Sequence, residues 1–479
     1  MASYGKGVYS AYDTPHGFER KNLNGVSIRE AAREIPVIRE TEVIVVGGGP
    51  GGTAAAITAA RNGAKTVLVE RYGHLGGMAT GGLVNIIPNL ADIYGKQRIG
   101  GFCQEFITRL KNRGAADYPP KSAWGAADEA LVDYYARANM AHFYLRQNDK
   151  NERIVLYSAV IDPEVGKDEL NLMAEEAGVE LLLHTWVVAP IVENGRVLGV
   201  ITESKAGRQA ILGKVVIDST GDGDLLPGTV GETDDYMRPG SRIAQFGFVF
   251  WMAGVDLDAY DAFAAAHPEE LKEISRKITE AGGRPTFSRG LLSHQKGVVW
   301  VHRLIGSLHQ TDPEEMTFTD VGARRYAVHS WELLQQYMPG FENSFIMLSA
   351  PQLGTSGGRR ILGQYHLTED DMNRDEPFAD TVAVFADNDR GDLSLQHPAT
   401  YVPYRALLPR DVEGLLVACR AFSADYEFSE YFNLIPHCMC FGQAAGAAAA
   451  IAVKKDISVS DVPYAELKEL LLAGGAILP

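Results

Sequence analysis

The chain has 479 residues, of which 46% are hydrophobic and 22% are charged, and this balance is typical of a soluble globular protein rather than a disordered one. Its formal net charge of −16 at pH 7 argues against nucleic acid as a partner, because an acidic surface repels phosphate backbones. Four cysteines in so long a chain do not indicate a disulfide scaffold. We recognise no secretion signal and no membrane-spanning run, so we expect a cytoplasmic protein.

The length and the regular N-terminal pattern predict more than one domain. A chain of 479 residues exceeds one ordinary hydrophobic core, so we expect two or three domains. Residues 1–40 are predicted to form an arm with a helix-like segment at 27–35. An apolar, β-branched strand is expected at 41–48, a helix of small residues at 51–63 and a second strand at 65–70. Together these three elements make a βαβ unit.

The later elements place both ends of the chain in one domain. Helices are expected in an insertion at about 100–150, and the Asn194-Gly195 pair predicts a β-hairpin turn. From 233 to 400 the alternation of strand and helix loses its regularity, which indicates a second domain. The chain then returns to a strand at 412–422 and a small-residue helix at 441–453. We therefore predict that the first domain is discontinuous and consists of 41–232 and 401–479.

The βαβ unit carries a dinucleotide-binding fingerprint. Gly47, Gly49 and Gly52 form G-x-G-x-x-G, with a strand before them and a helix after them. The first glycine permits a tight turn, the second lets the backbone approach a pyrophosphate, and the third lets helix and strand pack closely. Glu70 ends the next strand 18 residues after Gly52, where a carboxylate accepts hydrogen bonds from ribose hydroxyls and disfavours the 2′-phosphate of NADP.

A second glycine-rich segment favours FAD over NAD. Residues 71–82 read R-Y-G-H-L-G-G-M-A-T-G-G. Their L-G-G-x-x-T core resembles a segment that runs alongside the flavin in FAD-dependent oxidoreductases related to the fumarate reductase and succinate dehydrogenase flavoproteins. The backbone must pass close to the flavin there, and larger side chains would block it. An NAD dehydrogenase has no need for such a segment.

Four further motifs extend this resemblance over nearly the whole chain from Glu34. They are V-I-D-S-T-G-D-G-D at 216–224, G-R-R-I-L-G at 358–363, V-P-Y-R-A-L-L-P at 402–409 and G-Q-A-A-G at 442–446. The resemblance implies an α/β fold of the glutathione-reductase type, with a Rossmann-type FAD-binding domain and a mixed α+β substrate domain at 233–400. It also implies that the last helix begins near its G-Q-A-A-G motif and points its N-terminus at the flavin. The chain departs from the family pattern at Cys419-Arg420 and at 433–437.

The fingerprint and the resemblance together predict one cofactor, FAD, and a set of residues that bind it. These residues are Gly47, Gly49, Gly51, Gly52, Glu70, Arg71, Gly76, Gly77, Met78, Thr80, Val187, Gly221, Asp222, Arg420, Gly442, Gln443 and Ala445.

Flavin redox chemistry also needs a group that carries the accompanying proton. His437 is the first catalytic candidate, because it directly precedes the expected last helix and an imidazole titrates near neutrality. Tyr426 flanks the same loop, and Arg359 is suited to clamp a substrate carboxylate. His397 is a further candidate in the second domain. For each of them a purely structural function is the alternative.

Other cofactor sites are not expected. The H-C-x-C run at 437–440 lacks a second pair of ligands, so no metal site is predicted. No second dinucleotide fingerprint is recognised, so electrons must come from or go to a molecule that visits the flavin. Covalent attachment of the flavin through His74 or Cys103 stays open at this point.

The sequence therefore predicts a dehydrogenase, oxidase or reductase that transfers hydride between a small organic substrate and the flavin N5 of FAD. Its partners would be that substrate and an unidentified electron donor or acceptor, with no nucleic acid and no membrane, and the polar arm is compatible with a homo-oligomer. Two alternatives remain, namely a flavin-dependent monooxygenase and a non-catalytic FAD-binding subunit.

Overall fold

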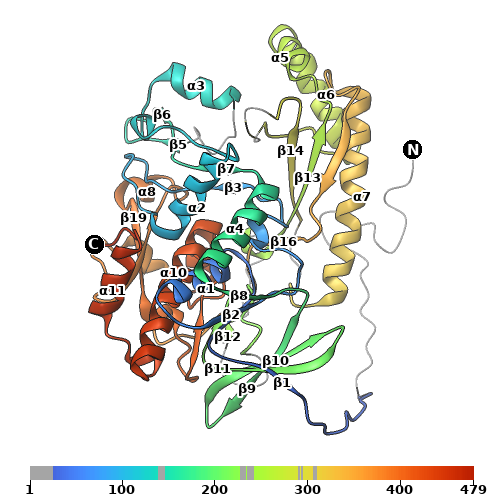
Figure 1. The fold of residues 1–479 in the computed structure, drawn as a ribbon. Helices are drawn as coiled ribbons and strands as arrows, with labels where there is room; N and C mark the ends of the chain where they lie inside the picture. The colour runs from blue at the N-terminus through green and yellow to red at the C-terminus, as the bar shows by residue number, and fades with distance from the viewer. Residues whose placement is uncertain are drawn as a thin grey trace.

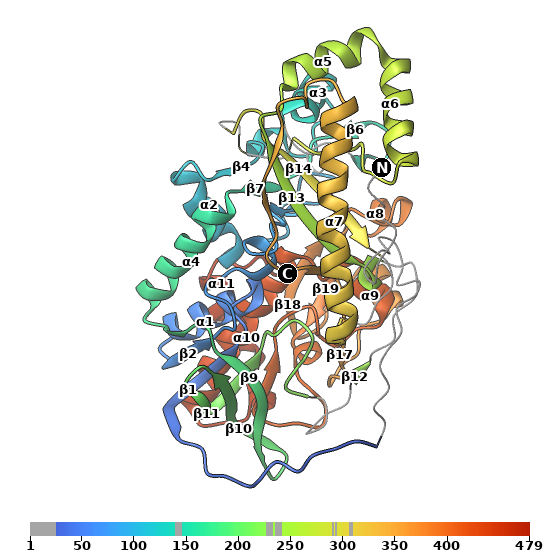
Figure 2. The same ribbon diagram turned by 90° about the vertical axis from the view of Figure 1, so that its right-hand side faces the viewer.

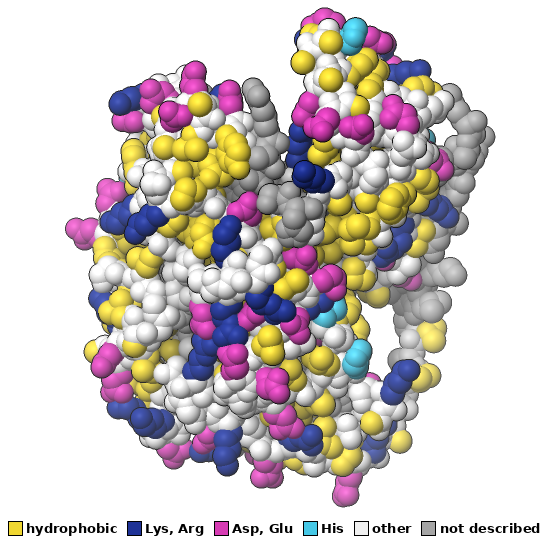
Figure 3. Space-filling view, turned by 45° about the horizontal axis from the view of Figure 1, so that its top comes forward, with side chains coloured by type: hydrophobic (Ala, Val, Ile, Leu, Met, Phe, Trp, Pro, Cys, Tyr) yellow, Lys and Arg dark blue, Asp and Glu magenta, His cyan; other side chains and the backbone are white. Residues whose placement is uncertain are grey.

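The computed structural model describes residues 25–138, 146–226, 233–234, 242–289, 292, 295–305 and 310–479. Figure 1 shows a larger body that contains the main sheet, and a second sheet beside the long helix α7. Acidic and basic side chains are interspersed over the face drawn in Figure 3, so the negative charge is not gathered into one patch there.

A seven-stranded sheet forms the centre of the larger body, in the order β8-β2-β1-β11-β10-β9, with β20 paired to β11. The strands β8, β2, β1, β11 and β20 are parallel, and β9 and β10 form the antiparallel hairpin predicted from the Asn194-Gly195 turn. The bounds are β1 Val37–Val46, β2 Thr66–Val69, β8 Glu180–Leu182, β9 Trp186–Glu193, β10 Arg196–Ser204, β11 Gly207–Asp218 and β20 Leu415–Val417.

Two helices from opposite ends of the chain pack closely on this sheet. They are α1, Pro50–Arg61, and α10, Ile435–Lys455. A Cβ atom placed on Gly442 would lie 2.0 Å from the carbonyl oxygen of Gly51, and one on Gly446 would lie 2.3 Å from that of Ala55. Only glycine therefore allows this contact between the two backbones, which joins both ends of the chain in one domain core.

The start of α10 corrects the sequence prediction. The helix begins at Ile435, almost two turns before the expected start at 441, and His437 lies in its first turn rather than in a preceding loop. Pro436 explains the early start, since a proline in the first turn is preorganised for helix and loses no hydrogen bond. Among the described residues, α10 is long and apolar enough to cross a membrane, but 94% of its apolar window is buried inside the protein, as in a core helix.

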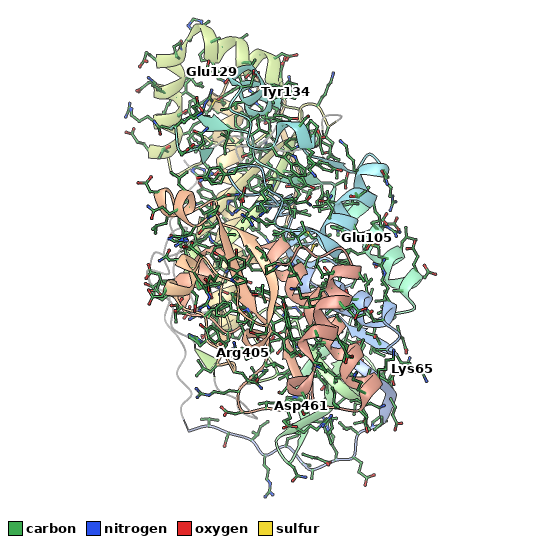
Figure 4. The ribbon with its side chains drawn as sticks, turned by 90° about the vertical axis from the view of Figure 1, so that its left-hand side faces the viewer. Lys65, Glu105, Glu129, Tyr134, Arg405 and Asp461 are labelled. Atoms are coloured by element: carbon green, nitrogen blue, oxygen red, sulfur yellow. The ribbon has the colours of Figure 1, made fainter. Side chains whose placement is uncertain are left out.

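The helical insertion lies on the larger body. Its helices are α2, Gly101–Asn112, and α3, Glu129–Ala138, and they are followed by α4, Pro163–Ala177. The predicted helices over 100–150 are thus partly confirmed, while residues 139–145 lie outside the described residues. In Figure 4, Glu129 and Tyr134 of α3 lie at the opposite end of the molecule from Asp461.

The second sheet consists of β13, Phe246–Ala253, β14, Val299–Ile305, and β15, Phe345–Ser349, with the short β16, Gly354–Thr355, paired to β13. Helix α7, Pro313–Tyr337, lies along one face of this sheet (Figure 2). Helices α5, Leu257–Ala266, and α6, Pro268–Glu280, form a pair at the far end of the molecule in both ribbon views.

The core of the larger body includes a further strand pair. Strands β18, Thr381–Ala386, and β19, Ala399–Pro403, share a hydrophobic cluster with α1 and α10. The remaining elements are β3 Ile86–Ile87, β4 Ala116–Asp117, β5 Arg146–Gln147, β6 Arg153–Ile154, β7 Ala159–Ile161, β12 Thr233–Asp234, β17 Arg360–Ile361, α8 Asp392–Gln396, α9 Tyr426–Tyr431 and α11 Tyr464–Ala473. The 3-10 turns are η1 Gly77–Ala79, η2 Lys121–Ala123, η4 Arg242–Ala244, η5 Glu369–Asn373, η6 Tyr404–Leu407 and η7 Val459–Asp461.

The N-terminal arm does not contain the expected helix. Residues 27–35 are described without helical structure, and nearly all of them are exposed. A short helix without tertiary packing is marginal in water, because its nucleation is costly. Residues 1–24 of the predicted arm lie outside the described residues.

Candidate functional site

The dinucleotide turn has the geometry that its glycines imply. Gly47 has a φ of +96°, and a Cβ atom on it would lie 2.4 Å from the carbonyl oxygen of Ser219 at the end of β11. A Cβ atom on Gly52 would lie 1.7 Å from the carbonyl oxygen of Gly47, so this glycine brings α1 against the turn. Gly51 is equally constrained, because its Cβ position lies 1.9 Å from the carbonyl oxygen of Ala418.

Gly49 differs from these glycines, because its Cβ position has no atom within 4 Å. It forms the N-cap of α1, which has no side-chain cap and no acidic residue in its first turn. The first amides of a helix have no partner within the helix and carry a partial positive charge. Space for a side chain thus stays open next to Gly49 at the N-terminus of α1, and we call this space the cradle. An anionic pyrophosphate suits it.

Glu70 lies beside the same turn. Its carboxylate accepts hydrogen bonds from the backbone N–H of Gly48 at 2.5 Å and from that of Tyr72 at 2.7 Å, and the residue is only 7% exposed. The exposed Arg71 places its guanidinium carbon 5.1 Å from the ring of Trp186, and the next residue, Val187, is buried. The structure therefore brings Glu70, Arg71 and Val187 to one end of the sheet.

The second glycine segment lies against the first. The backbone N–H of Gly76 donates to the carbonyl oxygen of Gly48 at 2.8 Å, and a Cβ atom on Gly77 would lie 2.9 Å from the Cα of Gly49. The buried Thr80 donates its hydroxyl to the carbonyl oxygen of Leu75 at 2.5 Å, which closes the segment on itself. A flavin whose pyrophosphate lies at Gly49 can therefore extend along residues 76–83, which we call the flavin segment.

A partly buried ion pair lies at the end of the neighbouring strands. Arg420 donates from Nη2 to Asp222 Oδ2 at 2.8 Å, and Gly221 leaves room for its guanidinium, since a Cβ atom there would lie 2.5 Å from Nη1. Asp222 Oδ1 is buried and has no hydrogen-bond partner among the described residues. Burial raises the pKa of Asp222, which the charge of Arg420 opposes. An unpaired buried acceptor at this place suits a hydroxyl donor from the sugar or ribityl part of FAD.

Arg359 contacts this same loop instead of an open substrate site. Its Nε donates to the carbonyl oxygen of Asp222 at 3.0 Å, and its Nη2 donates to Asp224 Oδ1 at 2.6 Å. The neighbouring Arg360 is 1% exposed and donates from Nε to the carbonyl oxygen of Ala424 at 3.0 Å. The geometry thus assigns both arginines to holding backbone, and a substrate clamp by Arg359 stays a prediction.

His437 is completely buried in the first turn of α10. Its Nδ1 accepts a hydrogen bond from the backbone N–H of Leu434 at 3.2 Å, so the side chain caps the helix. The ring centroid lies 4.1 Å from that of Phe385 and 5.6 Å from that of Phe432. Burial, and then the positive charge of Arg242, lower the pKa of His437 to about 3. The imidazole is therefore neutral at physiological pH, and proton transfer by His437 stays a prediction.

Two predicted cofactor residues on α10 turn out to face the protein. Gln443 accepts a hydrogen bond from the N–H of Phe102 at 3.1 Å and donates to the carbonyl oxygen of Gly474 at 3.0 Å, so it joins α2 to the C-terminal segment. Ala445 is fully buried in the main hydrophobic cluster. Both lie two turns beyond the N-terminus of α10, which corrects their expected place at the helix start.

Two of the catalytic candidates are not joined to this site by the described contacts. His397 follows α8 and pairs its Nδ1 with Asp375 Oδ1 at 2.8 Å. Tyr426 is the half-buried first residue of α9. A catalytic role for either residue stays a prediction.

Sequence reasoning missed the part of the site that comes from the second sheet. Met78 Sδ lies 3.5 Å from the Cβ position of Gly354 in β16. Two residues later, the carbonyl oxygen of Ser356 accepts a hydrogen bond from the Asn433 side chain, directly before α10. Residues 354–356 thus join the flavin segment to the N-terminus of α10. The T-S-G-G run at 355–358 is a usable sequence signal, because small residues permit a close approach of the backbone.

Comparison with known proteins places this geometry in a family. The sequence pattern of the FAD dependent oxidoreductase family matches residues 42–471. A digeranylgeranylglycerophospholipid reductase of Methanocella arvoryzae is 28% identical over 183 residues, which cover 38% of this chain and 39% of that protein. The chain thus spans less than half the length of the curated relatives it matches.

Solved structures are matched at low sequence identity and with TM-scores below 0.5. A geranylgeranyl bacteriochlorophyll reductase-like protein of Thermoplasma acidophilum has 14% identity and a TM-score of 0.42, over 91% of this chain and 83% of that one. A p-nitrophenol 4-monooxygenase of Pseudomonas putida has 10% identity and a TM-score of 0.46, over 91% of this chain and 85% of that one. Because the family pattern covers most of the sequence, this chain belongs to the FAD dependent oxidoreductase family and is an enzyme whose cofactor is FAD.

Proposed function

We propose that the protein oxidises or reduces a small organic molecule by hydride transfer with FAD bound along Gly49 and the flavin segment. When bound, FAD supplies a two-electron acceptor or donor at its ring. The observation that carries this proposal is the contact between the two glycine segments, with the Cβ position of Gly77 at 2.9 Å from the Cα of Gly49. This contact places the two glycine segments side by side, so that an extended dinucleotide can follow both of them.

Three groups support the placement of the cofactor at this surface. The cradle at Gly49 suits the pyrophosphate, the carboxylate of Glu70 suits the ribose, and the unpaired Oδ1 of Asp222 suits a further hydroxyl. Each is matched to the part of FAD that it would hold by charge or by hydrogen-bonding capacity. Contact of the remaining predicted residues with FAD is likewise proposed, whereas the close backbone contacts of Gly51, Gly52 and Gly442 support the site through packing.

The N-terminus of α10 is proposed to lie at the flavin ring. Its side-chain cap is the neutral His437, and Arg242 donates to the carbonyl oxygen of Glu430 and to Asn433 Oδ1 immediately before the helix. A helix N-terminus together with a nearby guanidinium stabilises negative charge. This arrangement favours the reduced, anionic state of the ring, which a hydride acceptor requires.

We also propose the finer assignments that the sequence suggested. The relation to the fumarate reductase and succinate dehydrogenase flavoproteins is supported by the motif order at 76–80, 216–224 and 402–409. The FAD-binding domain is proposed to comprise 41–232 and 401–479, with the substrate domain at 233–400. The electron donor or acceptor is proposed to be a separate visiting molecule, and a homo-oligomer is compatible with the exposed residues 25–36.

An anaerobic reduction experiment tests the proposed function. The purified protein is loaded with FAD and mixed without oxygen with a panel of small alcohols, amines and acids, and the visible absorption of oxidised flavin is followed. We expect bleaching with at least one class of donor, or reoxidation of the prereduced protein by an unsaturated acceptor. A folded protein that refuses FAD, or that keeps FAD but exchanges electrons with no compound of either panel, would contradict the proposal.

A further inference from the structure

The two faces of the second sheet have different partners. In β13, the alternate residues Phe246, Phe248 and Phe250 pack in the cluster that includes residues of α7. Because side chains alternate along a strand, Gly247, Val249 and Trp251 share the opposite face. The register of β13 with β14 pairs Val249 with His302 and Trp251 with Trp300, so His302 and Trp300 lie on this opposite face as well.

This opposite face is directed at the flavin segment. The indole Nε1 of Trp300 donates to the carbonyl oxygen of Leu83 at 3.0 Å, and Leu83 packs in one cluster with Val249 and Trp251. At the other end of the face, Gly354 pairs with Gly247, and its Cβ position lies 3.5 Å from Met78 Sδ. The same side of the sheet thus meets the flavin segment at both ends.

His302 lies beside Gly247, the residue of this face that has no side chain. Its Nε2 lies 3.1 Å from the Cβ position of Gly247, and its ring is stacked on Trp300 with centroids 5.2 Å apart. The residue is half-buried, whereas Trp300 is only 8% exposed. Within β13 and β14, both of which the structure describes completely, His302 is the titratable residue on this face. The absence of a side chain at Gly247 makes room for the imidazole, which lies directly over that residue.

We propose that His302 is the catalytic residue that exchanges the proton accompanying hydride transfer, and that the substrate carries a hydroxyl or amino group on the carbon that is oxidised. This inference rests on the proposed function and names its acid–base group. The alternative His437 is fully buried, and its Nδ1 is engaged in capping α10. His302 belongs instead to the sheet face that meets the flavin segment.

The proposed step balances in atoms and electrons. The substrate loses a hydride from carbon to the FAD N5 and a proton from oxygen or nitrogen to the imidazole of His302. The C–H bond and the O–H or N–H bond break, and a C=O or C=N bond forms. The imidazolium then releases its proton to water, and the reverse reaction uses the same proton in the opposite direction.

The first test locates His302 without any substrate. Protein with ¹³C-labelled histidine is titrated with FAD, and ring resonances are followed by NMR, with His302 identified by the signal missing from His302→Gln. We expect the His302 signal to shift on addition of FAD. The signal of His329, an α7 residue whose Nε2 lies 2.7 Å from the carbonyl oxygen of Ala281, serves as the control and should stay in place. An unmoved His302 signal in protein that has bound FAD would overturn the proposal.

The second test measures the chemistry. The variants His302→Gln and His302→Asn are compared with His329→Gln in anaerobic reduction by the alcohols and amines that reduce the wild type. We expect both His302 variants to keep FAD affinity and thermal midpoint, and to slow flavin reduction by about 100-fold or more. Added imidazole should restore part of the rate and only in the His302 variants. Either variant, once shown to be folded, suffices for this comparison.

The outcomes separate this inference from the proposed function. Wild-type rates in a folded His302 variant would overturn the role of His302 and leave the function intact. Reduction of the wild type by donors that bear no hydroxyl or amino group, and not by those that do, would overturn the substrate class. A protein that binds FAD and exchanges electrons with no donor or acceptor would contradict the function itself.

Discussion

The dinucleotide turn and the second sheet differ in how far their structure can be predicted from sequence. At the turn, Gly47 and Gly52 are required by contacts with residues nearby in sequence or in the adjoining strand. The Cβ position of Gly52, for example, lies 1.7 Å from the carbonyl oxygen of Gly47. On the second sheet, the surroundings of a side chain depend on which face of the sheet it occupies. His302 acquires a neighbour in Gly247 only because β13 and β14 pair in one register. Local steric requirements can be predicted from sequence, whereas the environment of a sheet face depends on the segments that pack against it.

The largest effects are expected from a pair of alanine substitutions at the turn. Gly52→Ala drives a methyl group into backbone, so we expect a destabilisation of about 3 kcal/mol or more and loss of FAD. Gly49→Ala meets no protein atom within 4 Å, so the apoprotein should keep its thermal midpoint while FAD affinity falls. Calorimetry with and without FAD measures both effects. Equal thermal midpoints for the two apoproteins would refute the distinction between packing and cradle.

The next effect concerns acid stability and His437. The folded-state pKa of His437 is lowered from 6.5 to about 3, so the unfolded chain binds more protons between these values. Stability from this group is present above pH 6.5 and is lost as the pH falls toward 3, by about 1 kcal/mol per pH unit. His437→Phe should lessen this loss, at the cost of one helix cap. Urea unfolding at pH 7, 6 and 5 checks it, with His329→Gln as the control; parallel curves for wild type and His437→Phe would count against it.

A smaller effect is expected from a substitution on the second sheet. A Cβ atom at Gly247 lies 3.1 Å from His302 Nε2 and 3.6 Å from the carbonyl oxygen of Gly354, so Gly247→Ala must displace the imidazole slightly. We expect about a tenfold fall in the rate of flavin reduction by substrate, which corresponds to about 1.4 kcal/mol, with unchanged FAD affinity. Stopped-flow reduction and FAD titration measure the two quantities. A rate equal to that of the wild type would show that this side of the sheet is remote from the substrate.

The smallest expected effect is at Arg359. Its ion pair with Asp224 is partly exposed, so Arg359→Gln should cost less than about 1 kcal/mol of stability. If the arginine only holds the 222–224 loop, KM for a reducing substrate should not change. A large rise in KM with an unchanged thermal midpoint would instead restore the original prediction of a substrate clamp.

Sequence reasoning was most successful where a pattern has a local cause. The βαβ unit, the Asn194-Gly195 hairpin and the parallel sheet follow from hydrophobic periodicity and turn chemistry. It was least successful at α10, where the run of small residues suggested a start at 441. Pro436 and the cap by His437 begin the helix at Ile435, and the small residues serve its packing on α1. Gln443 and Ala445 consequently lie inside the helix instead of at its start, and their contact with the cofactor stays a prediction.

The class of cofactor could be predicted from sequence, because the spacing of Gly47, Gly49, Gly52 and Glu70 reflects contacts within one βαβ unit. Which residues meet the flavin segment from elsewhere in the chain depends instead on tertiary packing. Gly354 meets Met78, and Ser356 meets Asn433, through sheet pairing and helix packing, and no local rule links positions so far apart. The physical reason is that burial and strand register act between distant segments, so a side chain's surroundings exist only after the chain has folded.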